Sequence, residues 1–157
     1  MAFDYYTKPF SVKSILKLGI PREQIFLTDK AGFSLNEIGI GYYDLFLLHH
    51  PPLETGEEFE KNVLREWRQK NVLLQTGLVK TIGVSNFNQR QLEVLLLFCE
   101  KFGLVKPSVN QIELHPFNQN WYLVDFYKNN DIQVVAHTPL APISLPIMYY
   151  NRKLLRK

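Results

Sequence analysis

The sequence predicts an α/β fold in which a parallel sheet of about five strands is covered by helices. Five short apolar runs have the length of strands, and stretches with helical spacing lie between them. Strands that alternate with helices form right-handed βαβ units, which build parallel sheets. At 157 residues, the chain is long enough for one domain with a buried core. The strand-like runs are residues 25–30, 45–50, 81–86, 109–116 and 131–142.

The first elements are a short helix and a strand. Residues 11–18, SVKSILKL, have apolar side chains at near-helical spacing, and Gly19 with Pro21 ends the predicted helix. IFLTDK follows as a strand, and the connection of residues 31–41 after it is short.

A buried strand and a long helix come next. LFLLHH is an apolar run between Asp44 and Pro51, typical of a strand buried on both faces. Residues 57–75 place apolar side chains at near-helical spacing, and Gly77 ends the pattern. This predicts an amphipathic helix that packs on the sheet.

The segment TIGVSN predicts a buried strand whose last side chains, Ser85 and Asn86, emerge where the backbone leaves the sheet. A hydroxyl and an amide together can bind a planar carboxamide. A Ser-Asn pair after a strand is also typical of a turn or a helix cap. Asn88 then caps a predicted helix over 89–102, which Gly103 ends.

The last elements are the strand VNQIELHP, a shorter helix over 121–129 and the strand DIQVVAHTPLAP. Gln111 and His137 lie within these two strands, and His115 precedes a proline in a predicted turn.

The net charge of +3 comes from the end of the sequence. Arg152, Lys153, Arg156 and Lys157 supply four of the 18 cations, which leaves 14 cations against 15 acids, or −1. A neutral body with a short basic tail predicts neither a nucleic-acid partner nor a membrane partner, and residues 143–157 are interpreted as a solvated end.

The composition favours the cytoplasm. The single cysteine, Cys99, excludes an internal disulfide framework, and its apolar surroundings predict a buried thiol. The first residues lack a basic region followed by an apolar run, and no apolar stretch is long enough to cross a bilayer.

Four ordered motifs resemble the aldo-keto reductase family. They are YYDLFLLHHP at 42–51, GLVKTIGVSNF at 77–87, VNQIELHP at 109–116 and VVAHTPLAP at 134–142. FLTDK at 26–30 is similar to a strand of the fungal ketoamide and ketoester reductase branch.

The resemblance implies an incomplete (β/α)₈ TIM barrel, because a closed barrel has eight strands and typically ~250 residues. We expect a partial aldo-keto reductase domain over 1–142, truncated at both ends, and a divergent basic tail over 143–157. Residues 31–41 are similar only to the end of the family's helix at this point.

The resemblance also implies catalytic residues. Tyr5 matches the tyrosine that donates a proton to the substrate carbonyl, with Tyr6 as the alternative by one position and an exposed aromatic near the terminus as the other interpretation. Lys30 matches the lysine that lowers the pKa of that tyrosine, and a solvated lysine is the other interpretation. His49 matches the histidine that hydrogen-bonds the carbonyl, whereas the family's aspartate would precede Met1.

The cofactor implied is NADP(H), and the substrate is a small-molecule aldehyde or ketone. Ser85, Asn86 and Gln111 match the residues that bind the nicotinamide carboxamide. His137 replaces the tyrosine whose ring stacks on the nicotinamide, and Thr138 replaces a serine. No metal site is expected, because His49 and the structural His50 would point to opposite faces of a strand.

Three functional interpretations stay open. The first is the reductase, with its activity retained or lost. The second is a non-catalytic remnant or interaction protein that associates through its open sheet edges, and a truncated gene model would give the same sequence. The third is a protein that binds nicotinamide-like ligands without turnover.

Overall fold

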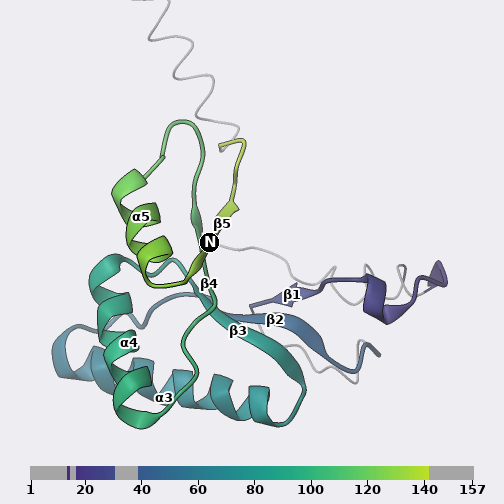
Figure 1. The fold of residues 1–157 in the computed structure, drawn as a ribbon, viewed down its shortest axis with the longest axis horizontal. Coiled ribbons are helices and arrows are strands. Elements are labelled where there is room, and N and C mark those ends of the chain that lie inside the picture. Colours follow the sequence, from purple (N-terminus) through teal and green to yellow (C-terminus); the bar gives the residue numbers. More distant parts are fainter. Residues whose placement is uncertain (1–13, 15–16, 31–38, 142–157) are drawn as a thin grey trace, which may run out of the picture.

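The fold is a five-stranded parallel sheet in the strand order β1-β2-β3-β4-β5 (Figure 1). The structure is a computed structural model that describes residues 14, 17–30 and 39–141. Every neighbouring pair of strands is parallel, as the sequence predicted. The strands are β1 (Thr28–Asp29), β2 (Tyr43–Leu48), β3 (Val79–Ser85), β4 (Val109–Glu113) and β5 (Gln133–His137).

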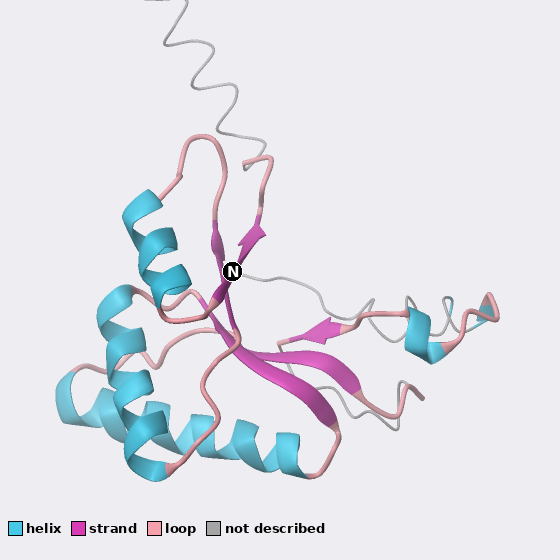
Figure 2. Ribbon diagram, in the orientation of Figure 1, coloured by secondary structure: helices cyan, strands magenta, loops and turns pink. Residues whose placement is uncertain are grey.

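Three α-helices lie on one side of this sheet (Figure 2). They are α3 (Gly56–Gln75), α4 (Gln89–Phe102) and α5 (Trp121–Asn129), and a short 3-10 helix, η2 (Arg22–Gln24), precedes β1. Tyr5 and the tail 143–157 lie outside the described residues. Most of the predicted helix over 11–18 and most of the connection 31–41 also lie outside them.

The main core lies between α3 and the strands. Phe59, Val63 and Trp67 recur every four residues, so they share the face of α3 that packs on β2 and β3. The Trp67 side chain is fully buried, and its Nε1 donates a hydrogen bond to the Val105 carbonyl at 2.9 Å. Burying a large apolar side chain contributes about 1.5–3 kcal/mol, and the hydrogen bond ties α3 to the segment between α4 and β4.

Helix α4 has the predicted bounds because its sequence carries both end signals. The Gln91 amide donates to Asn88 Oδ1 at 2.9 Å, and the Asn88 amide donates to Gln91 Oε1 at 3.0 Å, which forms a capping box. Gly103 ends the helix in the left-handed region with φ 61°.

The turn between β3 and α4 is tied to the rest of the fold. The Phe87 carbonyl accepts hydrogen bonds from the Tyr127 hydroxyl at 2.7 Å and from Asn110 Nδ2 at 2.9 Å. All three residues are buried. The segment directly after Asn86 is therefore held by both β4 and α5.

Strand β1 is shorter than predicted, and a side chain takes the backbone donor of the residue directly before it. The Leu27 amide donates to Asp44 Oδ2 at 2.9 Å, and Arg22 Nη2 contacts the same oxygen at 2.8 Å. The regular pairing with β2 covers Thr28 and Asp29, and the Leu27 carbonyl accepts from the Asp44 and Leu45 amides of β2.

A long apolar helix that could span a bilayer is not found in the part of the chain that the structure describes.

Candidate active site

Polar side chains collect where the carboxyl ends of the strands meet. Six of the seven sequence-predicted site residues lie in or directly after a strand near this edge, and Tyr5 lies outside the described residues. Parallel pairing sets Ser85 beside Gln111 and Glu113 beside His137. We call the following group the strand-end site: Lys30, His49, His50, Ser85, Asn86, Gln111, Glu113 and His137.

The ends of β3 and β4 are joined by hydrogen bonds at one carbonyl. The Ser85 hydroxyl donates to the backbone carbonyl of Gln111 at 2.7 Å, and the backbone N–H of Asn86 donates to the same oxygen at 3.0 Å. Ser85 is fully buried, so in this structure its hydroxyl braces the strands and is not presented to a ligand.

A glycine allows the strands to approach closely below the site. A Cβ added to Gly83 would lie 2.7 Å from the Val109 carbonyl oxygen and 2.8 Å from Leu47 Cδ2. Real side chains do not make such contacts, so only glycine fits here. Since side chains alternate along a strand, Gly83 and Ser85 share one face.

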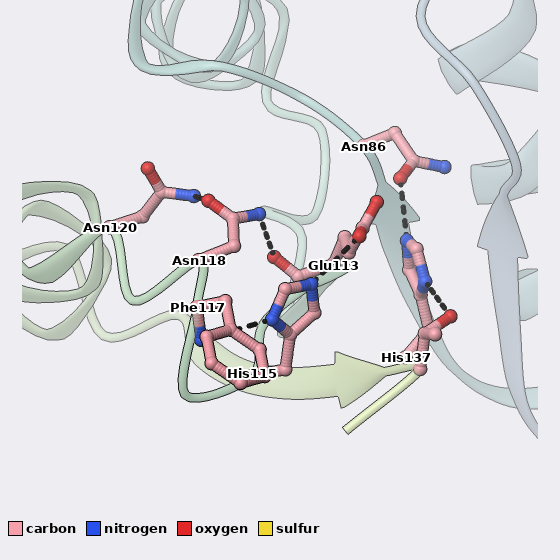
Figure 3. Close-up of polar contacts among 8 residues, drawn as sticks. Asn86, Glu113, His115, Phe117, Asn118, Asn120 and His137 are labelled. Carbon is pink, nitrogen blue, oxygen red and sulfur yellow. Dashed lines mark hydrogen bonds and ion pairs between the residues drawn. The ribbon is translucent and has the colours of Figure 1, made fainter. Parts of the chain in front are cut away.

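Asn86 lies between the end of β2 and the end of β5. Its backbone has φ 63°, a left-handed conformation that asparagine tolerates better than most residues. Its Nδ2 donates to the His49 carbonyl at 3.0 Å and lies 3.2 Å from both Ser85 Oγ and His50 Nδ1. Its Oδ1 lies 3.0 Å from His137 Nε2 (Figure 3).

These contacts define the proton positions on His137. Because Asn86 Nδ2 faces the His49 carbonyl, Oδ1 is the atom that faces His137, and His137 Nε2–H donates to it. His137 Nδ1, 3.1 Å from Thr138 Oγ1, then accepts from that hydroxyl.

The surroundings of His137 favour its neutral form. Burial lowers its pKa first, and the positive charge of Lys30 lowers it further. The Glu113 carboxylate opposes this effect, and His50 contributes to the lowering. Lys30 and Glu113 therefore both act on the His137 ring.

His115 belongs to the turn after β4, as the His-Pro sequence predicted (Figure 3). It is buried, its Nε2 lies 2.9 Å from Glu113 Oε1, and its Nδ1 accepts from the Phe117 amide at 3.2 Å. Asn118 Nδ2 donates to the Glu113 carbonyl at 3.0 Å. Both ring nitrogens of His115 are occupied, which supports a structural role.

The prediction that His49 and His50 point to opposite faces of a strand is wrong. Strand β2 ends at Leu48, so neither histidine lies in it. Their rings stack, with centroids 4.2 Å apart and planes 24° apart. His50, interpreted from the sequence as structural, is exposed and contacts Asn86.

Sequence reasoning missed the part of Glu113 in this site. Glu113 follows Gln111 by two residues, so the alternation of strand side chains places both on the same face. That spacing could have been used to find it. Lys30 follows β1, and its amide donates to Asp29 Oδ1 at 2.6 Å.

A separate pocket of about 270 Å³ lies between the first turns of α3 and α4, lined in part by Phe59, Arg90 and Val94. It contains no side chain of the strand-end site. Among the described residues, no three or more His, Cys, Asp or Glu side chains gather in a way that could hold a metal ion.

A parallel α/β half-barrel with polar side chains at the carboxyl ends of its strands has the arrangement of (β/α)₈ enzymes, whose active sites lie at that end. The sequence profile described as "Aldo/keto reductase family" matches residues 22–151. The chain belongs to the aldo/keto reductase family, which confirms the resemblance seen in its motifs.

Individual relatives agree with this assignment. Aldose reductase C of Dictyostelium discoideum is 36% identical over 164 residues, covering 83% of this chain and 50% of that protein. The NADPH-dependent alpha-keto amide reductase of Saccharomyces cerevisiae is 35% identical over 178 residues, covering 98% of this chain and 55% of that protein. The chain thus spans about half the length of these curated relatives.

A solved structure gives the same fold. An aldo-keto reductase enzyme from a Medee basin deep-sea metagenome library is 33% identical, with a TM-score of 0.76 over 90% of this chain and 54% of its own. The five strands and their helices therefore form part of a (β/α)₈ barrel, as predicted.

Proposed function

We propose that this chain carries the nicotinamide-binding part of an NADP(H)-dependent reductase of aldehydes, ketones or ketoamides. Family membership supports the reaction class, and the name of the yeast relative supports the cofactor. One observation carries the proposal: the ends of β3 and β4 bring Asn86 and Gln111 to one edge, joined through the Gln111 carbonyl.

The side chains available at this edge suit a carboxamide. A carboxamide donates two hydrogen bonds and accepts through its oxygen. The Gln111 amide offers both a donor and an acceptor, whereas Asn86 offers its oxygen, because its Nδ2 already donates to the His49 carbonyl and to Ser85 Oγ. Gln111 is partly exposed, and its side-chain amide has no hydrogen bond to any described residue. Asn86 is also partly exposed, whereas buried Ser85 supports it from below.

The remaining roles follow from the family. NADPH, when bound, supplies the hydride. Tyr5 would donate the proton to the carbonyl oxygen, and the positive charge of Lys30 would stabilise the phenolate that remains. His49 would orient the carbonyl by a hydrogen bond, and His137 would pack against the nicotinamide ring.

A titration of the full chain with NADPH, followed by cofactor fluorescence, tests the proposal. We expect saturation in the micromolar range and an affinity about tenfold lower for Gln111→Ala, the effect of roughly one hydrogen bond. The matched control is Gln133→Ala, which removes the same side chain from the exposed start of β5. Equal binding by wild type and Gln111→Ala would contradict the proposed site.

Turnover is measured separately. NADPH oxidation with a panel of aldehydes, ketones and ketoamides should depend on Lys30 and Tyr5. Saturable binding without oxidation would favour a ligand-binding protein over a reductase. A folded sample that does not bind NADPH would favour the non-catalytic interpretation.

A further inference from the structure

The two ends of the Asn86 side chain contact histidines from different strands. His137 at the end of β5 lies 3.0 Å from Oδ1, and His50 after β2 lies 3.2 Å from Nδ2. The resemblance that identifies Asn86 as a carboxamide ligand gives His137 a different role, stacking on the nicotinamide ring. A hydrogen bond from His137 to Asn86 is a property of this chain.

An unrestrained asparagine amide can present either end to a ligand, because its oxygen and nitrogen exchange places by rotation about χ2. Here rotation would place the amide nitrogen against His137 Nε2–H and the oxygen against the His49 carbonyl. Both contacts would then be repulsive. The orientation of the Asn86 amide is fixed by partners on both sides.

The fixed amide keeps capacity for a ligand. An amide oxygen has two lone pairs and His137 uses one, so Oδ1 can accept a second hydrogen bond. Asn86 is partly exposed, so a ligand can approach this residue. The inference rests on the proposed function, because it concerns how this site presents its amide to the nicotinamide carboxamide.

We propose that His137 is a positioning residue that donates from Nε2 to Asn86 Oδ1 and thereby fixes the orientation in which Asn86 meets a ligand carboxamide. His137 acts through Asn86, so its contribution is distinct from ring stacking. Thr138 Oγ1 at 3.1 Å from Nδ1 supports the same tautomer.

The charges around the ring are compatible with this role. Lys30, Glu113 and His50 act on His137, and the stacked His49 lies behind His50. Burial and Lys30 lower the pKa of His137, which favours the neutral ring. Nε2 remains a donor in the protonated ring, so the contact does not require one charge state.

Two substitutions separate positioning from stacking. His137→Phe keeps an aromatic face and removes the donor, whereas His137→Gln removes the ring and keeps an N–H donor near the position of Nε2. We expect the NADPH dissociation constant to rise about tenfold in His137→Phe and to rise less than that in His137→Gln, which keeps the donor and loses only the packing of the ring. The control is Val135→Ala, two residues earlier on the same face of β5.

A double-mutant cycle gives the second measurement. If His137 acts through Asn86, His137→Phe causes no further loss of affinity once Asn86→Ala is present. Additive losses, or NADPH binding by His137→Phe as tight as that of wild type, would overturn the proposal.

Nitrogen-15 NMR of the full chain without ligand tests the positioning role of His137 separately from the proposed binding of NADPH. We expect the proton on His137 Nε2, and we expect the Asn86 side-chain amide signals to shift in His137→Phe but not in Val135→Ala. A proton on Nδ1 alone would overturn the positioning role, whatever the result with NADPH. If wild type does not bind NADPH, the proposed function fails, and this spectrum alone decides the positioning role.

Discussion

Strand β4 has two faces that serve different purposes. On the face toward the helices, Asn110 is fully buried and Ile112 is 5% exposed, and Ile112 belongs to the same core as Trp67 and Tyr127. On the opposite face, Gln111 and Glu113 are partly exposed and belong to the strand-end site. Packing on one face therefore positions side chains that remain available on the other.

This comparison predicts that substitutions on the helix-facing side change stability, whereas those on the open side change ligand binding. The largest effect is expected for Trp67→Ala, which leaves a cavity in the core and breaks the hydrogen bond to Val105. We expect the free energy of unfolding in urea to fall by about 3–5 kcal/mol. The control Trp121→Ala, at a side chain that is 66% exposed, should change it by less than about 1 kcal/mol.

An intermediate loss of stability is expected at Gly83, on the face of β3 that points away from the helices. Gly83→Ala puts a methyl group against the Val109 carbonyl and Leu47, and overpacking of this kind costs about 1–3 kcal/mol. Thr81→Ala, two residues earlier on the same face, is the matched control and should cost less. A fully stable Gly83→Ala variant would show that β3 and β4 can separate here.

The smallest and sharpest comparison uses two adjacent residues. Asn110→Ala removes the hydrogen bond to the Phe87 carbonyl and should lower the free energy of unfolding by about 1 kcal/mol. Gln111→Ala should leave it within about 0.5 kcal/mol of wild type while weakening NADPH binding. Thermal unfolding of both variants checks this, and a large loss of stability in Gln111→Ala would show that the two faces are not separable.

Local signals in the sequence predicted most of the fold. The bounds of α4 follow from Asn88, Gln91 and Gly103, which act within one turn of the helix ends. The end of β2 was placed two residues too late, because the run LFLLHH gives no local signal where the strand stops. The hydrogen bond of the Leu27 amide, directly before β1, is to Asp44, 17 residues away, and could not be predicted from nearby residues.

The position of the candidate residues at strand ends was predictable from the sequence, but the geometry between them was not. Motifs placed Ser85, Asn86 and Gln111 at strand ends, and parallel pairing brings such ends together. The burial of Ser85 and the contact between Asn86 and His137 depend on tertiary structure, since the latter two residues are 51 positions apart. Tyr5 stays a prediction from the resemblance alone.

The two hydrogen bonds at the Phe87 carbonyl affect how a ligand would be received. A loop that is ordered before binding loses little conformational entropy when a ligand arrives. Because Tyr127 and Asn110 hold the residue next to Asn86, this turn would lose little conformational entropy on binding a ligand. At this turn, the lifetime of a complex would then depend on the contacts that the ligand makes.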